Sequence, residues 1–409
     1  MKILWIVNML LPEAADCLGV KAGFSGTWMI NLSKQLAATP EIDLAIACIH
    51  GEKFRDFMVD NTRYFCIPGN GKTMLFYHPE IIQYWDMIEE RFSPDIVHFH
   101  GTEYSHGISY LRKYPDKKKV LTIQGIIDKT SYYHWGGLPV SVLLKYRMLS
   151  ECLYFNGMIE RKILARRNVK YENELIRTIP YATGRTDWDK YYMQSVNPTI
   201  QYYRCYYDLR EEFYTAPKWN INKVHRNVIF ASTSAQVPMK GGHKAMGKIN
   251  SGRTKVILDI YTTDELTDEQ KTALNRNGCQ VRGALALNEV QAVQEDADIL
   301  VFAECLEDPY RYTARLSFST KVTDYLRAGK CIFAIGDKDI APIDYFTRYD
   351  SAVTTTNYEE VYAKLQMLVD RPELITEYGK KGYECGCAHH DEQKMSQLFT
   401  QTIMDAAKK

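Results

Sequence analysis

The sequence has no long hydrophobic run, almost no net charge and no metal-binding arrangement of cysteines. No stretch approaches the ~20 apolar residues of a membrane-spanning helix, and the apolar start of the chain is too short for a signal peptide. The 51 lysine and arginine residues nearly balance the 50 aspartate and glutamate residues, which excludes the strongly basic surface of a dedicated nucleic-acid-binding protein. We therefore expect a cytoplasmic globular protein.

The ten cysteines are scattered along the chain, and without a signal peptide this predicts reduced, mostly buried thiols. Cys385, Cys387, His389 and His390 lie close together in the sequence. Their spacing matches no standard zinc pattern, so we predict no metal site there.

With 409 residues the chain is long enough for two domains. Short apolar strands alternate with amphipathic helical segments, which is typical of α/β folds with parallel sheets. In the first half we predict strands at 2–9, 43–49, 63–67, 95–100 and 119–124. Helices are predicted at 25–38, 79–92, 105–114 and 139–168, followed by a polar, aromatic-rich passage over 184–222.

The same alternation then restarts, which predicts a second doubly wound domain. Its strands are expected at 227–231, 255–260, 279–282, 299–302 and 331–335. With a hinge at 216–220, the predicted domains are 1–218 and 219–390, and a final segment 391–409 crosses back to the first domain. Two Rossmann-like domains of this kind bind ligands at the carboxyl ends of their strands.

Several polar residues stand at such strand ends in the first half. His100 ends the strand in Asp-Ile-Val-His-Phe-His-Gly-Thr-Glu, and His98 shares its face at a deeper position. Glu103 and His106 follow at the mouth, and Gln124 ends the next strand. These side chains are candidates for holding sugar hydroxyls, with an ordinary buried imidazole as the alternative for each of the two strand histidines.

Two glycine-containing loops are candidate phosphate contacts. Gly26 lies in the loop after the first strand, although its spacing is not that of the dinucleotide-binding fingerprint and an ordinary turn is equally compatible. Lys240 and Gly241 open a helix after the restarted first strand, where a point charge and a close backbone approach suit a diphosphate. The alternative is a solvated lysine in a turn.

The strongest local signal is a helix in the second half. Ser319 or Thr320 can cap its start and Gly329 ends it. Lys321 and Asp324 are three residues apart and therefore share one helix face. They would offer a cation for phosphate beside a carboxylate for ribose, unless they form only a surface ion pair.

These motifs, in this order, resemble the retaining glycosyltransferases of family 4, which have the GT-B fold. The resemblance is carried by Lys240-Gly241, by Tyr325–Lys330 before an apolar strand, and by Asp95–Glu103 and Gly184–Asp189. The last two are similar to bacterial capsule and exopolysaccharide members. The resemblance implies a UDP- or GDP-sugar donor held by the second half and a glycan or lipid-linked acceptor held by the first. It also implies retention of anomeric configuration, without a cofactor or a bound metal.

The resemblance further implies a role for each matching residue. Lys240, together with Lys321, would neutralise the leaving diphosphate. Asp324 would hold the ribose, and His100 would stand near the reacting sugar. We interpret Asp187 and the carboxylate two residues after it as part of an acceptor-side or hinge helix rather than as metal ligands.

The sequence departs from the family pattern at two points. Leu316 stands where the family has a glutamate, and 233–236 lacks the arginine that usually precedes the lysine–glycine pair. Arg311 or Arg315 could replace that arginine by location. Two alternatives therefore stay open, a GT-B-fold sugar-nucleotide epimerase and a degenerate, non-catalytic sugar-nucleotide-binding protein.

A basic stretch at 161–170 is expected to end the long helix. Cations are favourable at a helix C-terminus, which suggests a solvated helix end. The alternative is peripheral contact with an anionic membrane at the inner face of the cell membrane, where a lipid-linked acceptor would lie.

Overall fold

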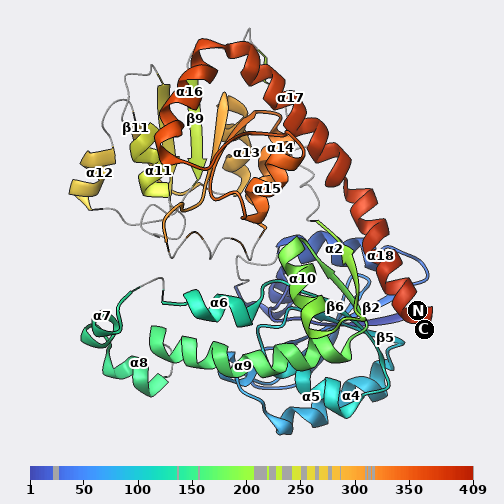
Figure 1. The fold of residues 1–409 in the computed structure, drawn as a ribbon. Coiled ribbons are helices and arrows are strands. Elements are labelled where there is room, and N and C mark those ends of the chain that lie inside the picture. Colours follow the sequence, from blue (N-terminus) through green and yellow to red (C-terminus); the bar gives the residue numbers. More distant parts are fainter. Residues whose placement is uncertain are drawn as a thin grey trace. The chain divides into compact units, whose positions relative to one another are not determined.

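The computed structural model divides the chain into two compact units (Figure 1). It describes residues 1–21, 27–135, 138–154, 157–206, 219–220, 227–232, 242–249, 256–262, 267–274, 279–285, 287–308, 311, 315 and 318–408. Unit 1 comprises Met1–Tyr206 and Gln393–Lys409, and unit 2 comprises Tyr207–Glu392. The structure divides the chain at 206 and 392, whereas the sequence analysis placed the corresponding boundaries at 218 and 390.

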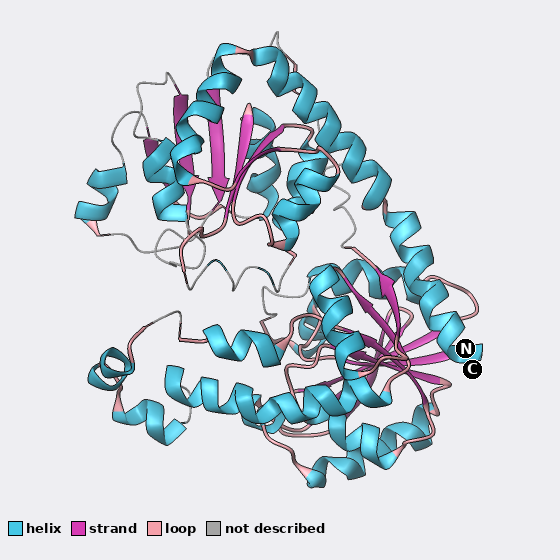
Figure 2. Ribbon diagram, viewed as in Figure 1, coloured by secondary structure: helices cyan, strands magenta, loops and turns pink. Residues whose placement is uncertain are grey.

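Unit 1 is built on an eight-stranded sheet of order β3-β4-β2-β1-β5-β6-β7-β8, with helices on both faces (Figure 2). The strands are β1 Lys2–Ile6, β2 Asp43–Ile49, β3 Arg55–Val59, β4 Thr62–Ile67, β5 Ile96–His100, β6 Lys118–Thr122, β7 Tyr181–Gly184 and β8 Gln201–Arg204. Every neighbouring pair is parallel except β3 and β4. Because β1, β5, β6 and β7 run in the same direction, their carboxyl ends meet at one edge of the sheet.

The helices of unit 1 include one correction to the sequence-based prediction. They are α1 Pro12–Leu18, α2 Thr27–Ala37, α3 Gly71–Leu75, α4 Ile82–Phe92, α5 His106–Lys113, α6 Ile127–Tyr133, α7 Val140–Lys145, α8 Leu149–Tyr154, α9 Met158–Thr178, α10 Asp187–Val196 and α18 Glu392–Lys408. The single helix predicted at 139–168 is wrong, because that range holds α7, α8 and only the first half of α9. Gly157 caps a new helix start, so the basic stretch 161–170 begins α9 and does not end it.

The core of unit 1 includes residues from the end of the chain. Phe399 on α18 is 3% exposed, and its ring lies 6.2 Å from Trp5 and 5.1 Å from His98. Ile403 and Ala406 belong to the same buried cluster. Helix α18 is therefore part of the packing of unit 1, because its apolar stripe covers the residues of β1 and β5.

Unit 2 is built on a six-stranded parallel sheet of order β11-β10-β9-β12-β13-β14. Its strands are β9 Asn227–Ser232, β10 Val256–Tyr261, β11 Cys279–Arg282, β12 Ile299–Ala303, β13 Cys331–Ile335 and β14 Val353–Thr355. Its helices are α11 Gly242–Ile249, α12 Asp268–Leu274, α13 Leu287–Asp296, α14 Lys321–Ala328, α15 Ala341–Arg348, α16 Val361–Asp370 and α17 Pro372–His389. The prediction of two Rossmann-like parallel sheets is confirmed, with β3 as an antiparallel addition.

Three glycines let α17 pack closely against its neighbours. A Cβ atom at Gly379 would lie 2.8 Å from the carbonyl oxygen of Gly329, which is the left-handed residue that ends α14. A Cβ atom at Gly382 would lie 3.2 Å from the Ser351 carbonyl oxygen, and one at Gly386 would lie 3.1 Å from the Leu326 Cβ. The close approach of α17 to α14 and β13 therefore depends on residues without side chains.

Several elements escaped the sequence analysis. β3, β8 and β14 are edge strands, and α10 with β8 lies inside the passage that looked only polar and aromatic. Their alternation is weak because edge strands are short and half exposed. Within the described residues, no helix combines the length and apolarity that crossing a membrane requires.

Candidate functional site

Four polar side chains gather at the carboxyl ends of β5, β6 and β7 in unit 1. We call His100, Glu103, Gln124 and Arg185 the strand-end cluster. The Arg185 guanidinium acts electrostatically on both His100 and Glu103. A Cβ atom placed on Gly101 would collide with the Glu103 carboxylate and lie 3.4 Å from the Gln124 Cδ, so these two side chains meet over that glycine.

The two histidines of β5 are buried, neutral and stacked. Their rings lie 4.0 Å apart, and that of His100 lies 4.3 Å from Trp5. His98 pairs with the Thr122 hydroxyl at 2.7 Å. Burial lowers the pKa of His98 to about 3, and burial with the nearby charge of Arg185 holds the pKa of His100 well below its usual range. His98 shares the face of His100 as predicted, and the side chain of His100 is only 3% exposed.

Glu103 is the acidic group of the cluster. Burial raises the pKa of its carboxyl to about 7, although backbone N–H groups and Arg185 oppose that rise. Gly101 has a φ of 88°, and together with the collision described above this restricts the position to glycine. The loop after β5 is therefore shaped to bring a carboxyl against the sheet edge.

A second buried carboxyl, that of Glu172 on α9, lies near Glu103. It accepts hydrogen bonds from the backbone N–H of Ile127 at 2.6 Å and from the Thr102 hydroxyl at 3.4 Å. Burial raises the pKa of Glu172 to about 7, and the charge of Glu103 raises it further. The negative charge of Glu103 therefore disfavours ionisation of Glu172.

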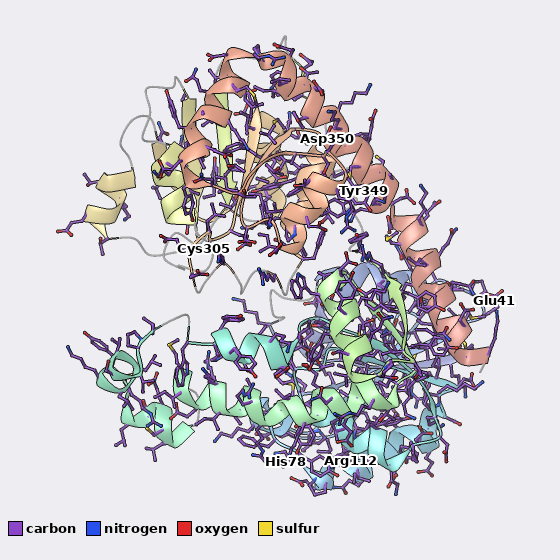
Figure 3. All side chains as sticks on the ribbon, in the orientation of Figure 1. Glu41, His78, Arg112, Cys305, Tyr349 and Asp350 are labelled. Carbon is purple, nitrogen blue, oxygen red and sulfur yellow. The ribbon has the colours of Figure 1, made fainter. Side chains whose placement is uncertain are left out.

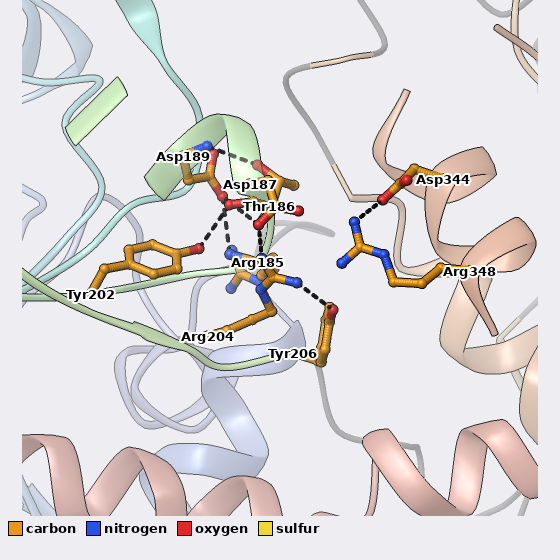
Figure 4. Close-up of polar contacts among 9 residues, drawn as sticks. All are labelled: Arg185, Thr186, Asp187, Asp189, Tyr202, Arg204, Tyr206, Asp344 and Arg348. Atoms are coloured by element: carbon orange, nitrogen blue, oxygen red, sulfur yellow. Dashed lines mark hydrogen bonds and ion pairs between the residues drawn. The ribbon is translucent and has the colours of Figure 1, made fainter. Parts of the chain in front are cut away.

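Arg185 is positioned by the turn that leads from β7 into α10 (Figure 4). The Asp189 carboxylate accepts hydrogen bonds from the backbone N–H groups of Arg185 and Thr186, each at 3.0 Å. The Thr186 hydroxyl in turn accepts from the Asp189 N–H at 2.9 Å, which completes a capping box. Asp187 pairs with Arg204. Both aspartates of this motif therefore have local structural partners.

Several buried polar atoms at this sheet edge have no hydrogen-bond partner among the described residues. They include Asn8 Oδ1, after β1, together with Glu103 Oε2 and Gln124 Nε2. Buried polar atoms are nearly always paired in folded proteins. Two acceptors and one donor, beside a guanidinium, form a set that suits the hydroxyl groups of a polar ligand.

His106 differs from its prediction as a residue at the mouth of the site. It begins α5, is 6% exposed, and its Nε2 lies 3.1 Å from the Val7 carbonyl oxygen. Burial lowers the pKa of the ring to about 4. Helix α5 packs its first turn onto the sheet, so His106 faces the end of β1 instead of solvent.

The predicted donor-side residues of unit 2 lie at the start of α14. The other six of its eight residues are buried, so Lys321 and Asp324 make up its accessible face. Thr320 occupies the cap position without a side-chain hydrogen bond, whereas the Ser319 hydroxyl accepts from the Lys321 N–H at 3.4 Å. Because α14 lies between the parallel strands β12 and β13, its N-terminus lies at their carboxyl edge.

Several predicted residues lie outside the described part of the chain. They are Gly26, Lys240, Gly241 and Leu316. Among the described residues, no group of three His, Cys, Asp or Glu side chains could hold a metal ion. In unit 2, Cys385 lies 3.2 Å from the Tyr345 hydroxyl, which His390 also contacts at 3.0 Å.

Sequence reasoning missed Asn8 and the role of Arg185 in the cluster. Both follow parallel strands, which is the signal that identified His100 and Gln124. Arg185 was overlooked because β7, a four-residue strand, was not predicted.

The chain resembles solved glycosyltransferase structures over its whole length, although no protein-family model and no curated protein sequence matches it. Sucrose-phosphate synthase from Thermosynechococcus elongatus is 10% identical, with a TM-score of 0.69, over 99% of this chain and 98% of that one. Anabaena HepE in complex with UDP and glucose is 11% identical, with a TM-score of 0.63, over 99% and 100%. WaaG, a glycosyltransferase involved in lipopolysaccharide biosynthesis, is 10% identical, with a TM-score of 0.60, over 97% and 99%. At these identities the likeness establishes the fold, and this chain has the two Rossmann-like domains of the GT-B fold.

Proposed function

We propose that this chain is a glycosyltransferase that moves a hexosyl group from a nucleotide-sugar donor to a glycan or lipid-linked acceptor. The observation that carries the proposal is the full-length likeness to glycosyltransferases, one of which was solved with UDP and with UDP-glucose. WaaG, with its part in lipopolysaccharide biosynthesis, supports a role in bacterial surface polysaccharide synthesis. The proposed reaction retains the anomeric configuration, needs no metal, and takes place at the inner face of the cell membrane.

The strand-end cluster supports binding of the acceptor by unit 1. Unpartnered oxygens on Glu103 and Asn8 can accept hydrogen bonds from sugar hydroxyls, and the Gln124 amide can donate one. The Arg185 guanidinium adds a fixed positive charge beside them. A hydroxyl-bearing ligand would satisfy polar atoms that are otherwise costly to bury.

His100 has a binding role in this proposal and no proton-transfer role. Its imidazole is buried, and the pKa lies well below its usual range because burial disfavours the charged ring. A neutral ring has one N–H donor and one acceptor nitrogen for a sugar hydroxyl, and with its lowered pKa it is neither a cationic acid nor a strong base at neutral pH. A neutral His100 agrees with the proposed reaction, in which the positive charge of lysines stabilises the leaving diphosphate.

The start of α14 supports binding of the donor by unit 2. Lys321 would face the diphosphate at a helix N-terminus, which favours anions, and Asp324 would accept the ribose hydroxyls. Lys240 is proposed as the second cation for the leaving diphosphate. Two cations beside the leaving diphosphate would stabilise the negative charge that develops on it during the reaction.

A thermal-shift screen with UDP, GDP, ADP and their sugar conjugates tests the proposal. A ligand that binds only the folded protein raises Tm by mass action, by an amount equivalent to about 2.7 kcal/mol at a hundredfold excess over Kd. We expect one nucleotide series to raise Tm, equally with and without EDTA.

Two variants locate the effect. Lys240→Ala should abolish the shift, whereas the matched control Lys271→Ala, an exposed lysine on α12, should leave it intact. A protein that is folded but shows no shift with any nucleotide would overturn the proposed donor site.

A further inference from the structure

Large apolar side chains are exposed on one part of unit 1, around α7, α8 and the start of α9. Among the described residues, nine large hydrophobic side chains are more than half exposed, and six of them lie between 144 and 163. These six are Leu144, Tyr146, Met148, Leu149, Leu153 and Ile163. We call this set the apolar projection. Single exposed apolar residues are ordinary, but a contiguous group marks an interaction surface.

The side chains of the apolar projection are not part of the hydrophobic core of unit 1. Leu149 and Leu153 are 76% and 72% exposed, and in α7 only Leu143 is buried. Figure 1 shows α7 and α8 at the periphery of unit 1, beyond the N-terminal end of α9 and away from the sheet, and Figure 3 adds the side chains. The two short helices therefore present their apolar residues outward.

Positive charge surrounds these residues. The segment 138–170 contains seven lysine or arginine residues and two glutamates, in a chain whose net charge is +1. Of the two carboxylates, that of Glu160 is buried and paired with Arg147. That of Glu151 accepts a hydrogen bond from the Met148 N–H at 3.0 Å. The surface is therefore both apolar and cationic.

Cations of α9 lie over aromatic rings in α6 and just after it. The Lys162 ammonium is 3.8 Å from the Trp135 ring, and the Arg166 guanidinium is 4.5 Å from the ring of Tyr132, which is 55% exposed. Tryptophan and tyrosine beside lysine and arginine are enriched where a protein meets the headgroup layer of a membrane, because their apolar bodies and polar tips suit that boundary.

We propose that the apolar projection docks on a bilayer that contains anionic lipid. Its leucines and tyrosine enter the headgroup region, and exposed cations of α9 such as Arg161 and Lys170 pair with lipid phosphates. A second copy of the chain fits less well, because two such surfaces would bring positive charge against positive charge. Docking itself does not depend on the proposed function. Its consequence rests on the proposed function, because a lipid-linked acceptor would then reach unit 1 from this surface.

Flotation of the purified full-length protein with vesicles tests the proposal. The vesicles contain phosphatidylcholine alone or phosphatidylcholine with phosphatidylglycerol, at low and at high salt. We expect flotation with the anionic vesicles, weaker flotation at high salt because the charges are screened, and little with the neutral vesicles.

Matched variants separate the apolar from the charged contribution. Leu149→Ser with Leu153→Ser should weaken partition by about tenfold for each leucine, since each loses most of a buried side chain. Arg161→Gln with Lys170→Gln should weaken it by about fivefold for each cation. Met58→Ser, at a methionine on β3 that is 58% exposed, should partition like the wild-type protein.

The outcomes distinguish the proposal from its alternatives and from the proposed function. Equal binding to neutral and anionic vesicles, no binding to either, or an undiminished partition of the leucine variant would overturn it. So would a dimer, seen by light scattering, that the leucine variant abolishes. Nucleotide-dependent thermal shifts should be the same in all these variants, so a failure of docking and a failure of the donor site are seen separately.

Discussion

The charge state of Glu103 makes the stability of the protein depend on pH in a predictable direction. Its carboxyl has a pKa of about 7 in the folded protein, against 4.5 for the unperturbed group, because burial penalises the charged form. The folded state therefore holds this proton more tightly than the unfolded state does. Its stabilising contribution is complete below pH 4.5 and is lost as pH rises through about 7.

The substitution Glu103→Gln removes this titration and keeps the size of the side chain. The difference between 4.5 and about 7 corresponds to about 3 kcal/mol once the group is fully ionised. Relative to the variant, the wild-type protein should lose up to that amount of unfolding free energy between pH ~4.5 and ~8. Part of the loss is shared with Glu172, whose pKa also depends on the charge of Glu103.

The assay is urea unfolding of both proteins, at several pH values across that range. Glu52→Gln, at an exposed position, serves as the matched control and should follow the wild-type curve. Wild-type and Glu103→Gln curves that run parallel from acid to alkaline pH would refute the reasoning, because they would mean that the Glu103 carboxyl is ionised as easily as in water.

Three further predictions concern the packing of the two units and are checked by thermal and urea unfolding. Gly379→Ala should destabilise the protein by about 1–3 kcal/mol, because the new Cβ meets a backbone carbonyl oxygen; the control Gly247→Ala, on a helix with open space around it, should stabilise by about 0.8 kcal/mol. Phe399→Ala should cost about 3–5 kcal/mol through lost packing on β1 and β5, whereas Met404→Ala, 38% exposed on the same helix, should cost far less. Asp189→Ala should cost about 1 kcal/mol or more, since the lost carboxylate accepts two hydrogen bonds of the α10 capping turn.

Much of the fold followed from the sequence because parallel strands in a layered α/β protein are buried on both faces. β2 and β13 are largely continuous apolar runs, and β5 is a buried run that carries two histidines. The predicted positions of these strands agree with the structure within a residue or two. The αL glycine at 329 ended its helix as predicted. The order of these elements was enough to indicate two Rossmann-like domains.

The remainder depended on tertiary contacts that no local pattern reveals. Among the described strands β8 pairs with β7 alone, and it has a half-exposed burial pattern, so its four residues carry little alternation. His100 was correctly placed at a strand end, but its burial comes from Trp5 and from Phe399, which is almost 300 residues away in the chain. The neutral histidine and the raised pKa of Glu103 follow from that packing, and sequence alone could not predict them.

The most direct test of the account is turnover of the donor. Release of nucleoside diphosphate from UDP- and GDP-sugars would be measured with and without a bacterial lipid and glycan extract, in the presence and absence of EDTA. The account predicts release from one nucleotide series, stimulated by the extract, unchanged by EDTA and lost in Lys240→Ala. A folded protein that releases no diphosphate from any nucleotide sugar, with or without the extract, would contradict it.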